Sequence, residues 1–198
     1  LIFSIIYSES FAASNIKKDK KTIINSIESH KDKLIEISDN IWEAAEPALL
    51  EFKSSKYLSD YAEENGFRVT RGVAEIPTAF VAEFGSGKPV IGILGEFDAN
   101  PGISQKKQPT KDPLVKGAAG HGCGHNLYGT GSLGAAIAIK EMIESGEISG
   151  TVRFYGTPAE ETIFAKVWMV RAGLFDDVDV CMDWHPSDEV EAATQSSK

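Results

Sequence analysis

The stretch Thr151-Val-Arg-Phe-Tyr-Gly-Thr-Pro-Ala-Glu-Glu161 decides the fold, because a β-rich run leads directly into a turn that carries two carboxylates. Helical patterns flank this strand at 132–143 and 165–172, and further strand patterns lie at 90–94 and 178–184. Strands that alternate with helices in this way predict an α/β fold, in which a mixed, largely parallel sheet is sandwiched by helices.

Two helices and two strands are predicted before this alternating region. Apolar stripes of helical period cover 19–46 and 54–65. The period then changes to that of strands at 67–71 and 78–84, whereas 99–117 shows no period and is expected to be a loop.

The composition is that of an ordinary globular domain. The chain has 198 residues, of which 42% are hydrophobic and 25% charged, so it is long enough to bury a core. A net charge of −9 argues against nucleic acid as a partner, because such proteins present a basic face. No apolar run approaches the roughly 20 residues that a membrane span needs.

The first residues differ from the rest of the chain. An apolar run at 1–7 is followed by small residues at 8–14, which predicts the remnant of a signal peptide over residues 1–13. This pattern predicts an exported protein, periplasmic or secreted. The alternative is that the run is an amphipathic start to the first helix, in a cytoplasmic protein.

Polar clusters follow each of the later predicted strands or precede the helix between them. They are Glu96-Phe-Asp98, His121-Gly-Cys-Gly-His125, Glu160-Glu161 and His185-Pro186. Because ligands collect at the carboxyl ends of strands in such sheets, we expect these clusters to meet at one edge.

The residue types in these clusters are those that bind metals. His, Cys and Glu are ligands for zinc or manganese, and the glycine between Cys123 and His125 permits a sharp backbone path. Of two adjacent carboxylates, one can bind a metal while the other stays free as a base.

Each residue also has an ordinary structural interpretation. His30, on a polar helix face, is expected to be a hydrogen-bonded structural residue, and Cys181, in a strand, a small core residue. An isolated Cys-Gly-His is weak evidence for a metal site. The metal hypothesis therefore rests on the four clusters occurring together.

Five motifs together resemble the M-twenty metallopeptidases. They are Gly95-Glu-Phe-Asp-Ala99, His121-Gly-Cys-Gly-His-Asn126, Gly156-Thr-Pro-Ala-Glu-Glu161, Met169-Val-Arg-Ala-Gly173 and Trp184-His-Pro186. The resemblance is to the amidohydrolase branch, with its hippurate, auxin-conjugate and aminobenzoyl-glutamate hydrolases. It extends from about residue 20 to the end.

The resemblance implies a site, a reaction and a fold. The implied metal ligands are Cys123, His125, Glu161 and His185, the implied catalytic base is Glu160, and Asp98 and His121 are implied to support the ligands. Two divalent ions, zinc or manganese, would serve hydrolysis of a small amide, an N-acyl or N-aroyl amino acid such as aminobenzoyl-glutamate. The fold would be a phosphorylase/hydrolase-like metallopeptidase catalytic domain.

The resemblance also implies further chain. Family members carry an inserted dimerisation domain, which makes homodimers, and a return to the catalytic domain that supplies the last ligand histidine. Residues 19–198 are therefore expected to be the N-terminal part of an incomplete catalytic domain. Two alternatives remain open: a non-catalytic metal-binding fragment, and a thiol hydrolase that uses Cys123 as nucleophile with His121 or His125 as base.

Overall fold

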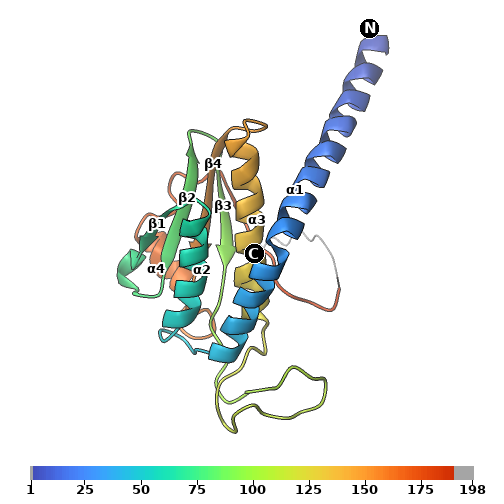
Figure 1. Ribbon diagram of the computed structural model, residues 1–198. Coiled ribbons are helices and arrows are strands. Elements are labelled where there is room, and N and C mark those ends of the chain that lie inside the picture. The colour runs from blue at the N-terminus through green and yellow to red at the C-terminus, as the bar shows by residue number, and fades with distance from the viewer. Residues whose placement is uncertain (1, 190–198) are drawn as a thin grey trace.

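The described part of the chain folds into a five-stranded sheet with helices on both faces (Figure 1). The computed structural model describes residues 2–189, and their side chains from residue 16 on. The elements are α1 (Ile2–Ala44), α2 (Phe52–Glu64), β1 (Arg68–Arg71), the 3₁₀ helix η1 (Val73–Glu75), β2 (Phe80–Ser86), β3 (Val90–Gly95), α3 (His125–Glu144), β4 (Gly150–Gly156), α4 (Ala165–Arg171) and β5 (Val180–Met182).

The sheet is mixed, as the sequence predicts, with the order β1-β2-β4-β3-β5. β2 pairs antiparallel with both β1 and β4, whereas β3 pairs parallel with both β4 and β5. The parallel part is therefore β4-β3-β5, and the carboxyl ends of these three strands lie at one edge of the sheet.

Two apolar clusters hold the helices against the sheet. On one face, α1, α2 and α3 contribute side chains such as Ile41, Leu58 and Leu133, which pack with Phe154 of β4. On the other face, η1 and α4 pack on Tyr155 of the same strand. Successive residues of β4 thus serve opposite faces, and the predicted sandwich of helices around a sheet is confirmed.

α3 begins at His125 rather than at residue 132, where the sequence predicts the helix to start. Glycines in the first turns hide the helical pattern, because glycine is a poor helix former. Gly129 is needed for packing: a Cβ there would come within 2.6 Å of the carbonyl oxygen of Glu96. The early start places His125 in the first turn of a helix that lies close against the end of β3.

Of the two residues predicted to have a purely structural role, His30 and Cys181, the structure confirms the prediction for one and contradicts it for the other. His30 is a structural residue as predicted, because its ring nitrogens lie 2.6 Å from the Tyr61 hydroxyl and 3.0 Å from a Glu141 carboxylate oxygen. The prediction that Cys181 is a core residue is wrong, because Cys181 is exposed. Its strand, β5, is at the edge of the sheet, so the sequence pattern of a buried strand does not bury it here.

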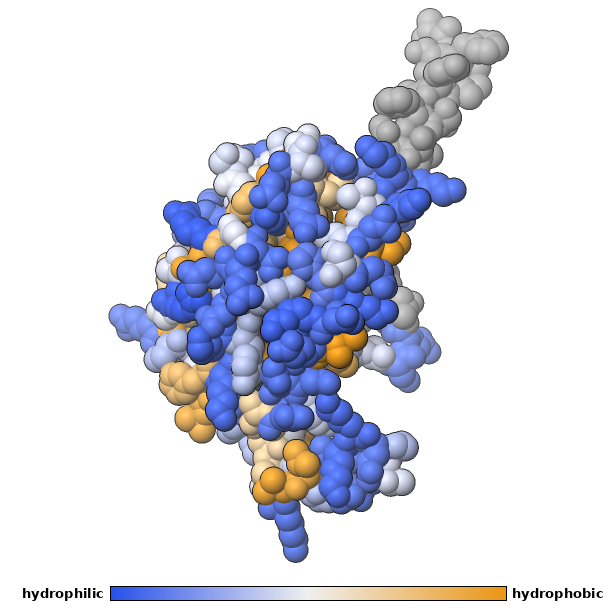
Figure 2. Space-filling model, in the orientation of Figure 1, coloured by the Kyte–Doolittle hydropathy of each residue, from blue (hydrophilic) through white to orange (hydrophobic). Residues whose placement is uncertain are grey.

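The predicted signal-peptide remnant at residues 1–13 stays a prediction. Residue 1 and the side chains of residues 2–15 lie outside what the structure describes, and the backbone from Ile2 onward is part of α1. Among the described residues, none of the helices has the length and apolar character of a bilayer span. The outer surface seen in Figure 2 is largely hydrophilic, in keeping with the charged composition.

Candidate metal centre

The predicted polar clusters meet where the three parallel strands end. Asp98 follows β3, Glu160 and Glu161 follow β4, and His185 follows β5. His125 reaches the same place from the first turn of α3. Gly124, with φ of 77°, occupies the left-handed conformation that glycine tolerates best, and it turns the chain from Cys123 into α3.

His125 lies at the centre of this group and is fully buried. Its Nδ1 lies 2.9 Å from Oδ1 of Asp98, a contact that requires the ring to donate from Nδ1 to the carboxylate. Its Nε2 makes no hydrogen bond, although carboxylate oxygens of Glu96 and Glu161 lie 3.0 and 3.9 Å away. Histidines that bind metals are commonly held in this way, with a carboxylate on the other nitrogen.

Cys123 and His185 lie on the open side of His125. Sγ of Cys123 is 3.3 Å from Nε2 of His185, and Nδ1 of His185 donates to the carbonyl oxygen of Pro186 at 2.9 Å. Ligand atoms of Cys123, His125 and His185 all lie within 4.8 Å of one another. When the two rings are neutral, both histidines therefore direct an Nε2 lone pair into one small volume that also holds a sulfur atom.

A second group of possible ligand atoms shares His125. Carboxylate oxygens of Glu96 and Glu160 and a nitrogen of His125 lie within 4.8 Å of one another. Glu96 is buried and pairs with the ammonium group of Lys166. Glu96 received no role in the prediction from sequence, although its position at the end of β3, two residues before Asp98, was the signal that could have identified it.

The electrostatics of the group call for a cation. Burial alone would lower the pKa of His125, but its contacts with Asp98 and Glu96 raise it to about 10. Burial and the neighbouring Glu161 raise the pKa of the Cys123 thiol to about 11. Without a metal, protons therefore occupy the atoms that a divalent ion would take, and binding such an ion would release them.

Two orphaned polar atoms show that the residues fit a metal. Nε2 of His125 and Oε1 of Glu161 are both buried without a hydrogen-bond partner, and they lie 3.9 Å apart. Buried polar atoms are normally paired, so such a pair requires an explanation. A divalent ion held by N, S and carboxylate ligands supplies one.

His121 lies beside this group rather than within it. Its Nε2 donates to the carbonyl oxygen of Ile41 at 3.0 Å, and its ring stacks on that of Trp42. Burial lowers its pKa to about 4, so the ring is neutral at pH 7. Among the described residues, His121 therefore makes its hydrogen bond and its ring contact with α1.

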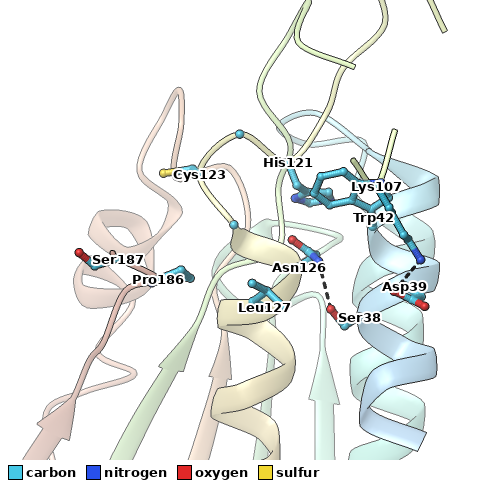
Figure 3. A pocket seen from close by; sticks show the side chains of 12 residues that line it. Ser38, Asp39, Trp42, Lys107, His121, Cys123, Asn126, Leu127, Pro186 and Ser187 are labelled. Atoms are coloured by element: carbon cyan, nitrogen blue, oxygen red, sulfur yellow. Dashed lines mark hydrogen bonds and ion pairs between the residues drawn. The ribbon is translucent and has the colours of Figure 1, made fainter. Parts of the chain in front are cut away.

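A cavity of about 560 Å³ opens beside the ligand group (Figure 3). Trp42 and His121 form one wall, Asn126 and Leu127 of α3 lie below, and Pro186 lies opposite. Cys123 also lines it, so the cavity adjoins the metal-type side chains. It could admit a small molecule to them.

These features are those of a metallopeptidase catalytic domain, and the comparison with known families agrees. Residues 92–195 match the model of Peptidase family M20/M25/M40. This range contains every cluster at the strand ends described above. The chain belongs to this family.

Individual relatives extend the similarity over most of the chain. One of the subunits of the p-aminobenzoyl-glutamate hydrolase of Escherichia coli (strain K12) is 49% identical over 167 residues, which are 83% of this chain and 34% of that protein. The Xaa-Arg dipeptidase of Mus musculus is 29% identical, over 90% of this chain and 40% of that protein. The chain thus spans about a third to two fifths of these curated relatives.

A solved structure shows the same fold. A Bacillus subtilis protein, described as a dinuclear metal-binding peptidase of the same family, has a TM-score of 0.65 and 25% identity. The match covers 79% of this chain and 44% of that one. Most of this chain therefore shares its fold with a solved member of the family.

Proposed function

We propose that this chain belongs to a metal-dependent amidohydrolase that cleaves the amide bond of an N-acyl or N-aroyl amino acid. The observation that carries the proposal is that ligand atoms of Cys123, His125 and His185 lie within 4.8 Å of one another, while the orphaned Oε1 of Glu161 lies 3.9 Å from Nε2 of His125. This donor set suits a borderline divalent cation better than it suits any structural role.

Cys123, His125, Glu161 and His185 would hold two divalent ions, zinc or manganese. Bound ions would supply Lewis acidity, which lowers the pKa of a water and stabilises negative charge on an oxygen. Asp98 keeps the His125 ring in the tautomer that leaves Nε2 free, because its carboxylate accepts the proton on Nδ1. A solved relative described as a dinuclear metal-binding peptidase supports the number of ions.

Glu160 would act as the general base. Its carboxylate is half-buried, and burial together with the negative charge of Glu96 raises its pKa. A raised pKa makes a carboxylate a better proton acceptor near neutral pH. In the proposed reaction, Glu160 takes a proton from the attacking water and gives it to the amide nitrogen as the C–N bond breaks.

The thiol hydrolase is the less favoured mechanism. Sγ of Cys123 lies 3.3 Å from Nε2 of His185, whereas this hypothesis pairs the thiol with His121 or His125. The pKa of the thiol, raised to about 11, keeps it protonated at neutral pH, whereas a nucleophilic cysteine needs a lowered one. The thiol-hydrolase mechanism also leaves Glu160 and Glu161 without a role.

The names of relatives support a substrate class. The Escherichia coli relative is named as part of a p-aminobenzoyl-glutamate hydrolase, so we propose aminobenzoyl-glutamate as the first substrate to try. Homodimerisation and export from the cytoplasm are further proposals. Size measurement and the cellular fraction that contains the protein would test them.

Elemental analysis tests the metal centre. The purified chain is compared with a Glu161→Ala/His185→Ala variant, and with a Glu144→Ala/His30→Ala variant that changes the same residue types elsewhere. We expect zinc or manganese in the parent and in the control, and loss of metal in the first variant. A parent that binds neither ion after reconstitution at neutral pH would contradict the proposal.

A hydrolysis assay distinguishes an active enzyme from a non-catalytic metal-binding fragment. Release of glutamate from aminobenzoyl-glutamate, stopped by a chelator and abolished by Glu160→Gln with metal still bound, is the expected result. A protein that holds stoichiometric metal but releases no amino acid would favour the non-catalytic metal-binding fragment.

A further inference from the structure

Glu51 is a buried carboxyl group that the proposed mechanism does not use. Its side chain is fully buried, at 0% exposure, at the residue before α2. It does not cap that helix, because no side-chain cap hydrogen bond forms there. Burying a carboxyl group is costly, so its contacts should explain its presence.

Both oxygens of Glu51 accept hydrogen bonds from distant parts of the chain. Oε1 accepts the backbone N–H of Ala159 at 2.9 Å, and Oε2 accepts the Thr78 hydroxyl at 3.2 Å. Burial raises the pKa of Glu51, and the hydrogen bonds from backbone groups oppose that rise. The contact with Ala159 joins the start of α2 to the turn that carries Glu160 and Glu161.

Ala159 is a point of strain in that turn. Its φ of 56° lies in the left-handed region, which costs a non-glycine residue of the order of 1 kcal/mol or more. Its carbonyl oxygen accepts the N–H groups of Ile163 and Phe164 at 3.1 and 3.0 Å. Such a conformation persists only where the surroundings hold it, and Glu51 holds its N–H group.

A second buried carboxylate holds the other side of Glu160. Oδ2 of Asp98 accepts the backbone N–H of Glu161 at 3.0 Å. The amide groups of the residues before and after Glu160 are therefore each bound to a buried carboxylate. Glu51 and Asp98 together fix the direction of the backbone from which the Glu160 side chain projects.

We propose that Glu51 is a positioning residue for the Glu160–Glu161 pair, acting through the backbone amide of Ala159. The inference rests on the proposed function, in which Glu160 is the base and Glu161 a metal ligand. The site then needs an acceptor oxygen, charged or uncharged, at the position of Oε1 of residue 51. A purely structural role would depend equally on the hydrogen bond to Thr78.

Three variants separate these roles. Glu51→Ala removes the acceptor for Ala159, Glu51→Gln keeps an oxygen there and can still pair with Thr78, and Thr78→Val removes only the other hydrogen bond. Should Glu51→Ala fail to fold, Glu51→Leu removes the acceptor while filling the space. Thermal midpoints of all variants show how far each change acts through stability alone.

Hydrolysis of aminobenzoyl-glutamate gives the first measurement. We expect Glu51→Ala to lower kcat by about 100-fold with little change in KM, because misplacing a catalytic group by about 1 Å has an effect of this size. Glu51→Gln and Thr78→Val should stay close to the parent. Equal losses in Glu51→Ala and Thr78→Val, or an unchanged kcat in Glu51→Ala, would overturn the proposal.

Two measurements do not need activity. Amide hydrogen exchange over residues 157–164 should be faster in Glu51→Ala but not in Glu51→Gln, and the dissociation constant for Co²⁺ should rise about 10-fold in Glu51→Ala alone. If the parent binds Co²⁺ but hydrolyses nothing, the proposed function fails while these two results still decide the role of Glu51. Exchange and Co²⁺ affinity unchanged in Glu51→Ala would overturn that role.

Discussion

Asp98 uses its two carboxylate oxygens for two different tasks. One accepts the Nδ1 proton of His125, and the other accepts the backbone N–H of Glu161. An asparagine has a single acceptor oxygen and cannot perform both tasks. We expect Asp98→Asn to weaken Zn²⁺ binding by about 10- to 100-fold, measured by competition with a chelator, because residues that orient metal ligands have effects of this size.

The matched control for this prediction is Asp112→Asn. It removes the same charge from a partly exposed residue that pairs with Lys106 in the loop before α3. Zn²⁺ affinity should stay at the parental value in the control. Equal weakening in the two variants would mean that net charge, rather than the orientation of His125, sets the affinity.

The burial of His121 leads to a prediction of how the stability of the protein depends on pH. Its pKa is about 4 in the folded protein, against an ordinary value of 6.5, because the ring is buried. Between these values the unfolded chain binds a proton that the folded chain does not, so stability falls as pH falls from 6.5 to 4. The loss from this residue is about 3 kcal/mol, since each pKa unit corresponds to about 1.4 kcal/mol.

Urea unfolding of the parent and of His121→Gln at pH 7 and pH 4 isolates this contribution. Glutamine can still donate to the carbonyl oxygen of Ile41 but does not titrate. The free energy of unfolding of the parent should therefore drop further than that of the variant. Parallel losses in both proteins would show that His121 is protonated in the folded state well above pH 4.

Local sequence pattern predicted the strands and most helices, but not where α1 and α3 begin. The runs at 90–94 and 151–155 became β3 and β4 with their ends almost unchanged. α3 was predicted too short, because its early glycines are there for packing rather than propensity. That packing depends on how closely the helix approaches β3, which no local pattern contains.

This close approach gives a prediction for α3. Gly129→Ala would bring a Cβ within 2.6 Å of the backbone oxygen of Glu96, and backbone cannot move aside as a side chain can. We expect a loss of about 1–3 kcal/mol in the free energy of unfolding, as for other overpacked sites, despite the better helix propensity of alanine.

Gly134→Ala in the same helix is the control. Its Cβ would meet a methyl group of Leu34 at 3.0 Å, which a small side-chain shift can relieve. The better helix propensity of alanine offsets part of the cost of that shift, so the control should lose less stability than Gly129→Ala. A larger loss in Gly134→Ala would mean that α1, not β3, limits the position of α3.

For the whole molecule, the sequence predicted which clusters meet but not everything that holds them. That the clusters holding Cys123, His125, Glu161 and His185 meet was predictable, because ligands collect at the carboxyl ends of strands in such sheets. The choice of these four as metal ligands came from the family resemblance. Glu51 gave no signal, because its contact with Ala159 spans more than a hundred residues and depends on how α2 packs. Glu96 was visible only as one more acid at a strand end.

The arrangement of the centre links metal binding to the stability of the whole chain. Its side chains come from the ends of β3, β4 and β5 and from the start of α3, so an ion held by them would tie four segments together. Because an unfolded chain has no such site, ligand binding raises stability by about 2.7 kcal/mol at a free ion concentration 100 times the dissociation constant.

We expect Zn²⁺ or Mn²⁺ to raise the thermal midpoint at neutral pH, and a chelator to reverse the rise. His185→Ala should lower the response because β5 then no longer shares the ion, whereas His30→Ala should keep it. A thermal midpoint that neither ion raises would show that this chain does not bind metal by itself.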